Sequence, residues 1–164
     1  MTKAVILAGG LGTRLMEETT IRPKPMVEVG GKPILWHIMK FYRSHGIREF
    51  IICAGYRQDY IKDFFARQYM HASDVTFDLA SGTVKTHKSE DCDWTVSVIN
   101  TGEATQTGGR LKRIREYVGD EPFCMTYGDG LSDVDVTAKI AAHKKSGALV
   151  TLTATYSPPR FGEL

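Results

Sequence analysis

The sequence predicts an α/β fold in which a mostly parallel sheet is covered by helices on both faces. Three observations support this prediction. Short apolar runs, typical of strands buried on both faces, occupy residues 5–8, 50–54 and 123–127. Segments with apolar residues at helical spacing lie between these runs. Strands that alternate with helices are joined by crossovers, so parallel pairing is the expected arrangement.

The first seventy residues are expected to form a strand, a loop, a helix, a second strand and a second helix. The first helix should cover residues 34–45, because its apolar residues follow a helical period and Gly46 stands where a C-terminal cap glycine belongs. The second helix is indicated by an apolar stripe at helical spacing, formed by Ile61, Phe64, Phe65 and Tyr69.

The middle of the chain has a different pattern. Residues 75–79 and 84–87 flank the turn-like segment 80–83, which predicts a hairpin or a short excursion from the sheet. Residues 95–99 alternate weakly and could form a strand. A helix of about three turns is then predicted by the apolar residues Leu111, Ile114, Tyr117 and Val118.

The last third should return to buried strands and a helix. The apolar run 123–127 is followed by Gly128-Asp129-Gly130, which should end the strand. A helix is expected from about residue 134 to Ser146, with Asp133 as its N-cap and Gly147 at its end. Residues 149–155 are expected to form another strand.

Composition argues against several classes of protein. The chain has 164 residues and a net charge of +2, too small to indicate a nucleic-acid partner or an acidic membrane surface. Its first apolar run, which ends at Ala8, is too short for a signal peptide or a membrane span. Three cysteines without C-x-x-C spacing are interpreted as thiols rather than metal ligands, and their odd number fits a cytoplasmic protein: Cys53, Cys92 and Cys124.

A glycine-rich segment follows the first predicted strand, from Gly9 to Leu15. Glycines let the backbone approach a phosphate chain closely, and successive N–H groups can hold its oxygens. The segment is not the dinucleotide fingerprint G-x-G-x-x-G, because, counted from Gly10, the position of the third glycine is occupied by Leu15. It is not a Walker A loop either, because Arg14 stands where the second glycine is required. A phosphate-binding loop of another type is therefore predicted, with a plain strand-to-helix turn as the alternative.

Basic residues strengthen the phosphate interpretation. Arg14 lies within the glycine-rich segment, and its guanidinium could bind a pyrophosphate through two hydrogen bonds. Lys24 stands between Pro23 and Pro25, which restrict its backbone and lower the entropy cost of directing its ammonium group. By contrast, the basic run 110–115 shares its helix with an apolar face and is interpreted as a solvated basic surface, except for Arg110 near the helix start.

Asp129 follows a predicted buried strand and lies between two glycines. The carboxyl end of a parallel strand is where ligands bind in open α/β sheets, so this carboxylate is well placed for a ligand. A turn-forming Asp-Gly pair is the alternative interpretation.

These segments, taken in order, resemble the sugar-1-phosphate nucleotidyltransferase family. The pattern G-G-x-G-T-R-L over residues 9–15, followed by P-K-P-M over residues 23–26, matches the family signature. Residues 30–39, 107–113 and 127–130 look most like the glucose-1-phosphate cytidylyltransferase branch. The resemblance implies a Rossmann-like three-layer sandwich of the nucleotidyltransferase type.

The resemblance also implies roles for individual residues. Arg14 would stabilise the departing pyrophosphate, Lys24 the α-phosphate, and Asp129 would be a Mg²⁺ ligand. Thr105 and Arg110 would lie on the nucleotide from the opposite side. The base, ribose and triphosphate would be held by the glycine-rich loop, namely Leu7, Ala8, Gly9, Gly10, Leu11, Gly12, Thr13 and Arg14.

The implied reaction converts CTP and glucose 1-phosphate into CDP-glucose and pyrophosphate, with Mg²⁺ as cofactor, for deoxysugar and surface-polysaccharide precursors. The sugar phosphate would attack the α-phosphorus in line. Because a phosphate monoester is already anionic near neutral pH, no general base is needed, and positioning and charge neutralisation should supply the catalysis.

The resemblance implies that residues 1–164 are one nucleotidyltransferase domain that is incomplete at its C-terminus. Residues 160–164 resemble a mid-chain segment of the family. The family's Glu-Lys-Pro and Asn-Gly-Gly segments and its second metal-binding aspartate, which lie downstream, are not found. The full-length form is expected to be a homo-oligomer.

Two alternatives remain open. One is a uridylyl- or thymidylyltransferase of the same family, although the Gly-Leu-Ala-x-Ala type of segment usual in those members is absent. The other is a catalytically incomplete nucleotide-binding fragment.

Overall fold

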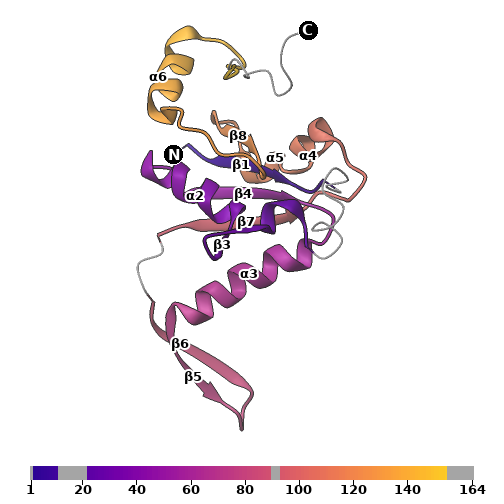
Figure 1. Ribbon diagram of the computed structural model, residues 1–164, viewed down its shortest axis with the longest axis vertical. Helices are drawn as coiled ribbons and strands as arrows, with labels where there is room; N and C mark the ends of the chain where they lie inside the picture. Colours follow the sequence, from indigo (N-terminus) through magenta and orange to yellow (C-terminus); the bar gives the residue numbers. More distant parts are fainter. Residues whose placement is uncertain (1, 11–21, 90–92, 155–164) are drawn as a thin grey trace. The chain divides into compact units, whose positions relative to one another are not determined.

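The computed structural model describes residues 2–10, 22–89 and 93–154 of the chain (Figure 1). The chain falls into two compact units, residues 1–132 and residues 133–164. Among the described residues, the first unit contains the sheet and most of the helices, and the second contains one helix.

The sheet of the first unit confirms the predicted parallel arrangement. Its strands run in the order β7-β4-β1-β8, and each neighbouring pair is parallel. All five residues of β1 are buried, because this strand has a neighbour on each side and side chains packed on both faces. The strands are β1 (Ala4–Ala8), β4 (Glu49–Ala54), β7 (Thr95–Asn100) and β8 (Cys124–Tyr127).

Helices cover both faces of this sheet, as predicted. Figure 1 shows α2 (Ile34–Ser44) and α3 (Gln58–His71) on one side, with α4 (Thr107–Arg113) and α5 (Arg115–Val118) on the other. Gly46 has φ +85° just after α2, which confirms it as the terminating glycine. The α5 side is closed by one apolar cluster of buried residues: Val5, Leu7, Ile51, Cys53, Ile114 and Val118.

The helix predicted around Ile114 is broken at that residue. The expected three turns are divided into α4 and α5, and Ile114 between them has φ −100° and ψ 9°. Its N–H bonds to the carbonyl of Leu111, three residues back, which tightens the turn. The break lets Ile114 and Val118 both lie against the sheet, whereas Tyr117 from the same predicted stripe is 39% exposed.

In the described part of the chain, two antiparallel hairpins accompany the sheet. The predicted one consists of β5 (Ser73–Asp78) and β6 (Thr83–Ser89), and Figure 1 shows it extending away from the sheet beyond the end of α3. The other, which the sequence pattern did not indicate, is the short pair β2 (Glu28–Val29) and β3 (Lys32–Pro33). Its two turn glycines both have positive φ, as a tight hairpin turn requires.

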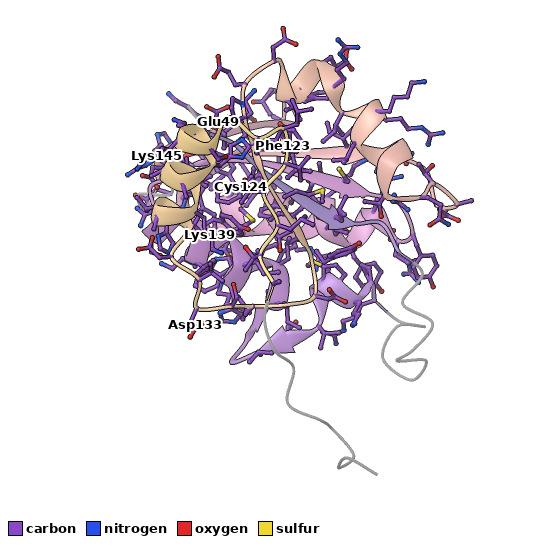
Figure 2. All side chains as sticks on the ribbon, turned by 90° about the horizontal axis from the view of Figure 1, so that it is seen from above. Glu49, Phe123, Cys124, Asp133, Lys139 and Lys145 are labelled. Carbon is purple, nitrogen blue, oxygen red and sulfur yellow. The ribbon has the colours of Figure 1, made fainter. Side chains whose placement is uncertain are left out.

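Strand β8 is less buried than its apolar sequence predicted. It pairs with β1 on one side and is an edge of the four-stranded sheet. Met125 and Tyr127 are therefore 43% and 60% exposed. Figure 2 shows Phe123 and Cys124 at the start of β8, at the same end of the sheet as Glu49 of β4.

The second unit, described by itself, contains α6 (Val136–Ser146), which carries Lys139 and Lys145 (Figure 2). Its N-cap is Asp135, whose Oδ1 accepts a hydrogen bond of 2.9 Å from the N–H of Ala138. The prediction of Asp133 as the cap was therefore wrong by two residues. Gly147, with φ +65°, ends the helix as predicted.

The strand predicted at residues 149–155 is wrong for the part that is described. Residues 149–154 form no strand, and Leu149, Val150 and Leu152 are between 70% and 99% exposed. A strand needs a neighbour to satisfy its backbone hydrogen bonds, and no described strand pairs with this segment. Thr155 lies outside the described residues. No helix among the described residues is long and apolar enough to cross a bilayer.

Asp93 links three elements at the amino-terminal end of the sheet. Its Oδ1 accepts a hydrogen bond of 2.7 Å from Nε of Arg43 in α2, and its Oδ2 one of 2.5 Å from Nε of Arg48 before β4. The next strand, β7, begins two residues later at Thr95. The hydrogen bonds from both guanidinium groups lower the pKa of Asp93 from 3.8 to about 2.

We predict that Asp93→Asn lowers the thermal unfolding midpoint near pH 7. A depressed carboxyl pKa contributes stability above the unfolded value near 3.8, and this contribution is lost as the pH falls towards about 2. The difference between wild type and variant should therefore shrink below pH 4. Circular dichroism melts at pH 7, 4 and 2.5 measure it, with Asp63→Asn, which removes an exposed partner of Arg67, as the control. A constant difference at all three pH values would contradict the assignment.

Candidate functional site

The carboxyl ends of three neighbouring strands meet at one edge of the sheet. In register, Ala8 of β1 lies beside Ala54 of β4, and Leu7 lies beside Tyr127 of β8. An open cleft of about 540 Å³ lies at this edge. It is lined by Leu7, Ala8, Gly9, Gly10, Lys24, Pro25, Glu103, Ala104, Thr105, Gln106, Thr107, Arg110, Tyr127, Gly128 and Asp129.

The structure brings most of the predicted site residues together in this cleft. Residues from four separate parts of the sequence line it: the start of the glycine-rich loop, Lys24, the segment before α4, and Asp129. The predicted residues in the rest of that loop lie outside the described part of the chain: Leu11, Gly12, Thr13 and Arg14.

Lys24 and Asp129 form an ion pair at the cleft, with 2.5 Å between Nζ and Oδ2. Their side chains are 32% and 35% exposed, so water and ligands can reach both charges. An ion pair this exposed contributes roughly 0–1 kcal/mol to stability. The pair is therefore better suited to holding two opposite charges in a ligand site than to stabilising the fold.

The backbone on each side of the pair is held closely. Lys24 opens the short 3₁₀ turn η1 (Lys24–Met26), in which Pro25 and Met26 are buried. Gly128 donates its N–H to the carbonyl of Leu7 at 2.9 Å. A β-carbon at Gly128 would lie 2.9 Å from Cγ of Pro25, so the lack of a side chain allows β8 and η1 to approach. This contact places Asp129 opposite Lys24.

Arg110 is a buried cation beneath the cleft and is only 5% exposed. Its Nη2 donates to the carbonyls of Gly9 at 2.8 Å and Glu103 at 3.1 Å. Its Nη1 donates to Oγ1 of Thr101 at 2.7 Å and to the carbonyl of Ala54 at 3.2 Å. Burial lowers the pKa of this guanidinium, which nonetheless stays protonated near neutral pH. A direct contact between Arg110 and the nucleotide stays a prediction.

Glycines make room for this guanidinium. A β-carbon at Gly9 would lie 2.0 Å from Nη1 of Arg110, and one at Gly55 would lie 2.9 Å from the same atom. The Gly55 position is also enclosed by the carbonyls of Gly9 and Gly102, at 2.9 and 2.8 Å from that β-carbon. Glycine is thus required at Gly9 and Gly55 for packing, in addition to any role in phosphate binding.

Arg113 is exposed, as the interpretation of the basic run as a solvated surface predicts, but its guanidinium also makes two hydrogen bonds. Its Nη1 donates to the carbonyl of Thr101 in a close contact and to Oγ1 of Thr105 at 2.7 Å. The side chain of Thr105, a predicted nucleotide contact, is therefore fixed by a hydrogen bond from the Arg113 guanidinium.

Two cysteines lie in the described part of the chain, and neither is in a metal-binding cluster. Cys53 is fully buried, and burial raises the pKa of its thiol to about 11, against the opposing effect of the Arg110 charge. Burial also raises the pKa of Cys124. Within residues 2–10, 22–89 and 93–154, no group of three or more His, Cys, Asp or Glu side chains could hold a metal. Cys92 is outside these ranges.

The single carboxylate of Asp129 nevertheless fits one type of metal. Mg²⁺ in nucleotide sites takes one or two carboxylates and completes its octahedron with phosphate oxygens and water. Asp129 is exposed at the cleft, so a metal held there could reach a ligand.

Thr101 and Gly55 contact Arg110 at the site but were not predicted from the sequence. Thr101 is fully buried, and its hydroxyl donates to the carbonyl of Ala54 at 2.7 Å while accepting from Arg110. One signal was present: Gly55 follows an apolar strand, just as Gly9 follows the first strand. The acceptor of the Thr101 hydroxyl is a backbone carbonyl, and residue types do not reveal such a partner.

A parallel α/β sheet whose carboxyl edge carries a glycine-lined cleft with a Lys–Asp pair defines the class of this protein as an α/β ligand-binding domain of the nucleotidyltransferase type. The chain belongs to the nucleotidyl transferase family, whose model matches residues 3–162.

Individual relatives narrow the comparison. The chain is 58% identical to the glucose-1-phosphate cytidylyltransferase of Salmonella typhimurium over 99% of its own length and 63% of that protein. It is 28% identical to the UTP–glucose-1-phosphate uridylyltransferase of Synechocystis, over 95% of the chain and 38% of the relative. The crystal structure of HddC from Yersinia pseudotuberculosis complexed with GMP-PN is 29% identical, with a TM-score of 0.64 over 87% of the chain and 54% of that structure. The chain therefore spans about three fifths of the length of its cytidylyltransferase relative.

We predict opposite effects for two glycine-to-alanine changes. Gly55→Ala should lower the free energy of unfolding by about 1–3 kcal/mol, because its methyl group would overlap the carbonyls around Arg110. Gly108→Ala, in α4 with open space around its Cα, should raise it by roughly 0.5–1 kcal/mol through helix propensity. Urea unfolding measures both, and equal effects of the two changes would show that the crowding at Gly55 is absent.

Proposed function

We propose that this chain forms the nucleotide-binding part of a Mg²⁺-dependent glucose-1-phosphate cytidylyltransferase. CTP and glucose 1-phosphate would give CDP-glucose and pyrophosphate. The observation that carries the proposal is the exposed Lys24–Asp129 ion pair in a glycine-lined cleft. Its cation could bind a phosphate and its carboxylate a metal ion. The choice of cytosine and glucose is supported by the 58% identity to the Salmonella enzyme.

The triphosphate would occupy the glycine end of the cleft. Backbone N–H groups from Gly9 onward would bind its oxygens, with Arg14 stabilising the departing pyrophosphate. Lys24 would leave Asp129 and pair with the α-phosphate, whose non-bridging oxygens carry the negative charge during attack on the phosphorus. Thr105, held by Arg113, would contact the nucleotide from the other wall.

Asp129 would hold the metal together with the nucleotide phosphates. Bound there, Mg²⁺ would neutralise phosphate charge and keep the triphosphate in the geometry for in-line displacement. On ligand binding, the Lys24–Asp129 ion pair would be replaced by two others, Lys24 with phosphate and Asp129 with the metal. Because an exposed ion pair contributes little to stability, breaking it would cost little free energy.

No general base is required by this reaction. The second pKa of a phosphate monoester is near 6, so the attacking oxygen of glucose 1-phosphate is already deprotonated at neutral pH. Among the described residues, the charged side chains that line the cleft are those of Lys24, Glu103, Arg110 and Asp129, and no histidine or cysteine of that part of the chain lines it. Binding and orientation, rather than proton transfer, would supply the rate.

Two alternatives are favoured by specific observations. The first alternative is a uridylyl- or thymidylyltransferase, which would use UTP or dTTP in place of CTP. It is supported by the 28% identity to a uridylyltransferase. The coverage of 63% of the Salmonella enzyme favours a nucleotide-binding fragment that lacks turnover by itself.

We expect the chain to bind CTP more tightly than UTP or dTTP in the presence of Mg²⁺, as measured by titration calorimetry. Addition of glucose 1-phosphate and an assay for released pyrophosphate then separate the enzyme from the fragment. CTP binding without pyrophosphate release would show that this chain is a nucleotide-binding fragment without turnover. Tighter binding of UTP or dTTP would contradict the cytidylyl assignment.

We expect separate effects of the two members of the ion pair. Asp129→Asn should remove most of the increase in CTP affinity that Mg²⁺ causes, because the amide is a poor metal ligand. Lys24→Met should weaken CTP binding about tenfold or more while changing cytidine binding little, because its charge meets phosphate. Calorimetry with and without Mg²⁺ measures both, with Asp63→Asn as the charge-matched control. An Asp129→Asn variant with a normal Mg²⁺ response would exclude Asp129 as the metal ligand.

A further inference from the structure

We propose that Glu103 makes the cleft selective for cytosine, because its carboxylate accepts a hydrogen bond from the amino group at C4 of the base. This inference rests on the proposed nucleotide binding. It goes further by naming the side chain that distinguishes CTP from UTP.

The cleft is lined by segments that follow strands at both edges of the sheet. Asp129 follows β8 at one edge, and Glu103 follows β7 at the other, with Gly9 and Gly10 after β1 between them. A triphosphate bound at Lys24 and the two glycines would leave the uncharged part of the nucleotide, its ribose and base, to the wall that carries Glu103.

Glu103 is a carboxylate of the cleft that has no cationic partner in the described part of the chain. Asp129 pairs with Lys24, whereas the side chain of Glu103 makes no hydrogen bond or ion pair with any described residue. It is exposed and therefore solvated in the free protein. An unpaired carboxylate repels phosphate and can only accept hydrogen bonds, so it suits a polyanionic ligand where that ligand presents a donor.

The backbone that carries Glu103 is fixed on both sides. Its carbonyl accepts a hydrogen bond of 3.1 Å from Nη2 of Arg110, which also donates to the carbonyl of Gly9. Gly102 has φ +84° and donates its N–H to Oδ1 of Asn100, the last residue of β7, at 3.0 Å. The side chain therefore starts from a defined position relative to the end of β1, which lowers the entropy cost of placing its carboxylate on a ligand.

The chemistry of a carboxylate separates the two pyrimidine bases. Cytosine carries an amino group at C4, and uracil carries a carbonyl oxygen there. The carboxylate can pair with the amino group, whereas it would face the carbonyl oxygen in an unfavourable contact between two acceptors. The other polar side chains on this wall, Thr105, Gln106 and Thr107, each carry a donor as well as an acceptor and could pair with either base. Among the described residues of this wall, Glu103 is therefore the side chain that can reject uracil.

The test compares Glu103→Gln with wild type by titration calorimetry with CTP, UTP and dCTP in the presence of Mg²⁺. Glutamine keeps the size of the side chain but replaces one acceptor by a donor, which can pair with the carbonyl oxygen of uracil. We expect CTP affinity to fall about tenfold or more, while UTP affinity stays the same or rises. The loss should be as large with dCTP, which keeps the base and lacks the 2′-hydroxyl group. Glu121→Gln, a matched change at an exposed position outside the cleft, should leave all three affinities unchanged.

Other outcomes would overturn the inference. A Glu103→Gln variant that keeps the wild-type preference for CTP over UTP would exclude Glu103 from base selection. A loss that is equal for CTP and UTP, or absent with dCTP, would place the carboxylate on the ribose. If Glu103→Gln does not fold, Glu103→Ala removes the carboxylate and keeps the carbonyl that Arg110 holds, and it must lower the preference for CTP by a similar factor. A wild-type chain that binds no CTP would reject the proposed function, whereas CTP binding with an unchanged preference in the variant would reject this inference alone.

Discussion

The carbonyl groups at the ends of adjacent parallel strands must find hydrogen-bond donors where the sheet stops. In this protein the buried guanidinium of Arg110 donates to the carbonyl of Gly9, and it shares the carbonyl of Ala54 with the N–H and hydroxyl of Thr101. The guanidinium also donates to the hydroxyl of Thr101. Without a donor, the buried oxygens among these would each cost free energy comparable to a lost hydrogen bond. The bonds also bring the glycine-rich loop, the turn after β4 and the segment before α4 to one place. The cleft exists at this edge because these three segments are held together there.

The same constraint explains the distribution of glycines and charges. Gly9 and Gly55 are small because the guanidinium occupies the space that side chains would fill. Arg113 extends the arrangement by holding Thr105, so two cations of one helical segment support the wall from behind. Lys24 and Asp129 lie on the open side, where their charges are available to a ligand. The buried Arg110 and the exposed Arg113 thus hold the backbone of the site, and the Lys24–Asp129 pair supplies the groups proposed to bind phosphate and metal.

Much of the fold could be predicted because β1 and β4 are apolar runs with neighbours on both sides, and α2 has a clear apolar face and a terminating glycine. Strand β8 and residues 149–154 were predicted less well because apolarity does not reveal whether a partner strand is present. Lys24 and Asp129 could be predicted from glycines and prolines beside them. The contacts of Arg110 could not, because most of its partners are backbone carbonyls that every residue type carries.

The most direct test of this account is a crystal structure of the chain with CTP and Mg²⁺. The account predicts the triphosphate along Gly9 and Gly10, the metal on Asp129, Lys24 on the α-phosphate, and Arg110 still bonded to the carbonyl of Gly9. A triphosphate bound outside the cleft would contradict the account, as would an Arg110 that has left the carbonyl of Gly9.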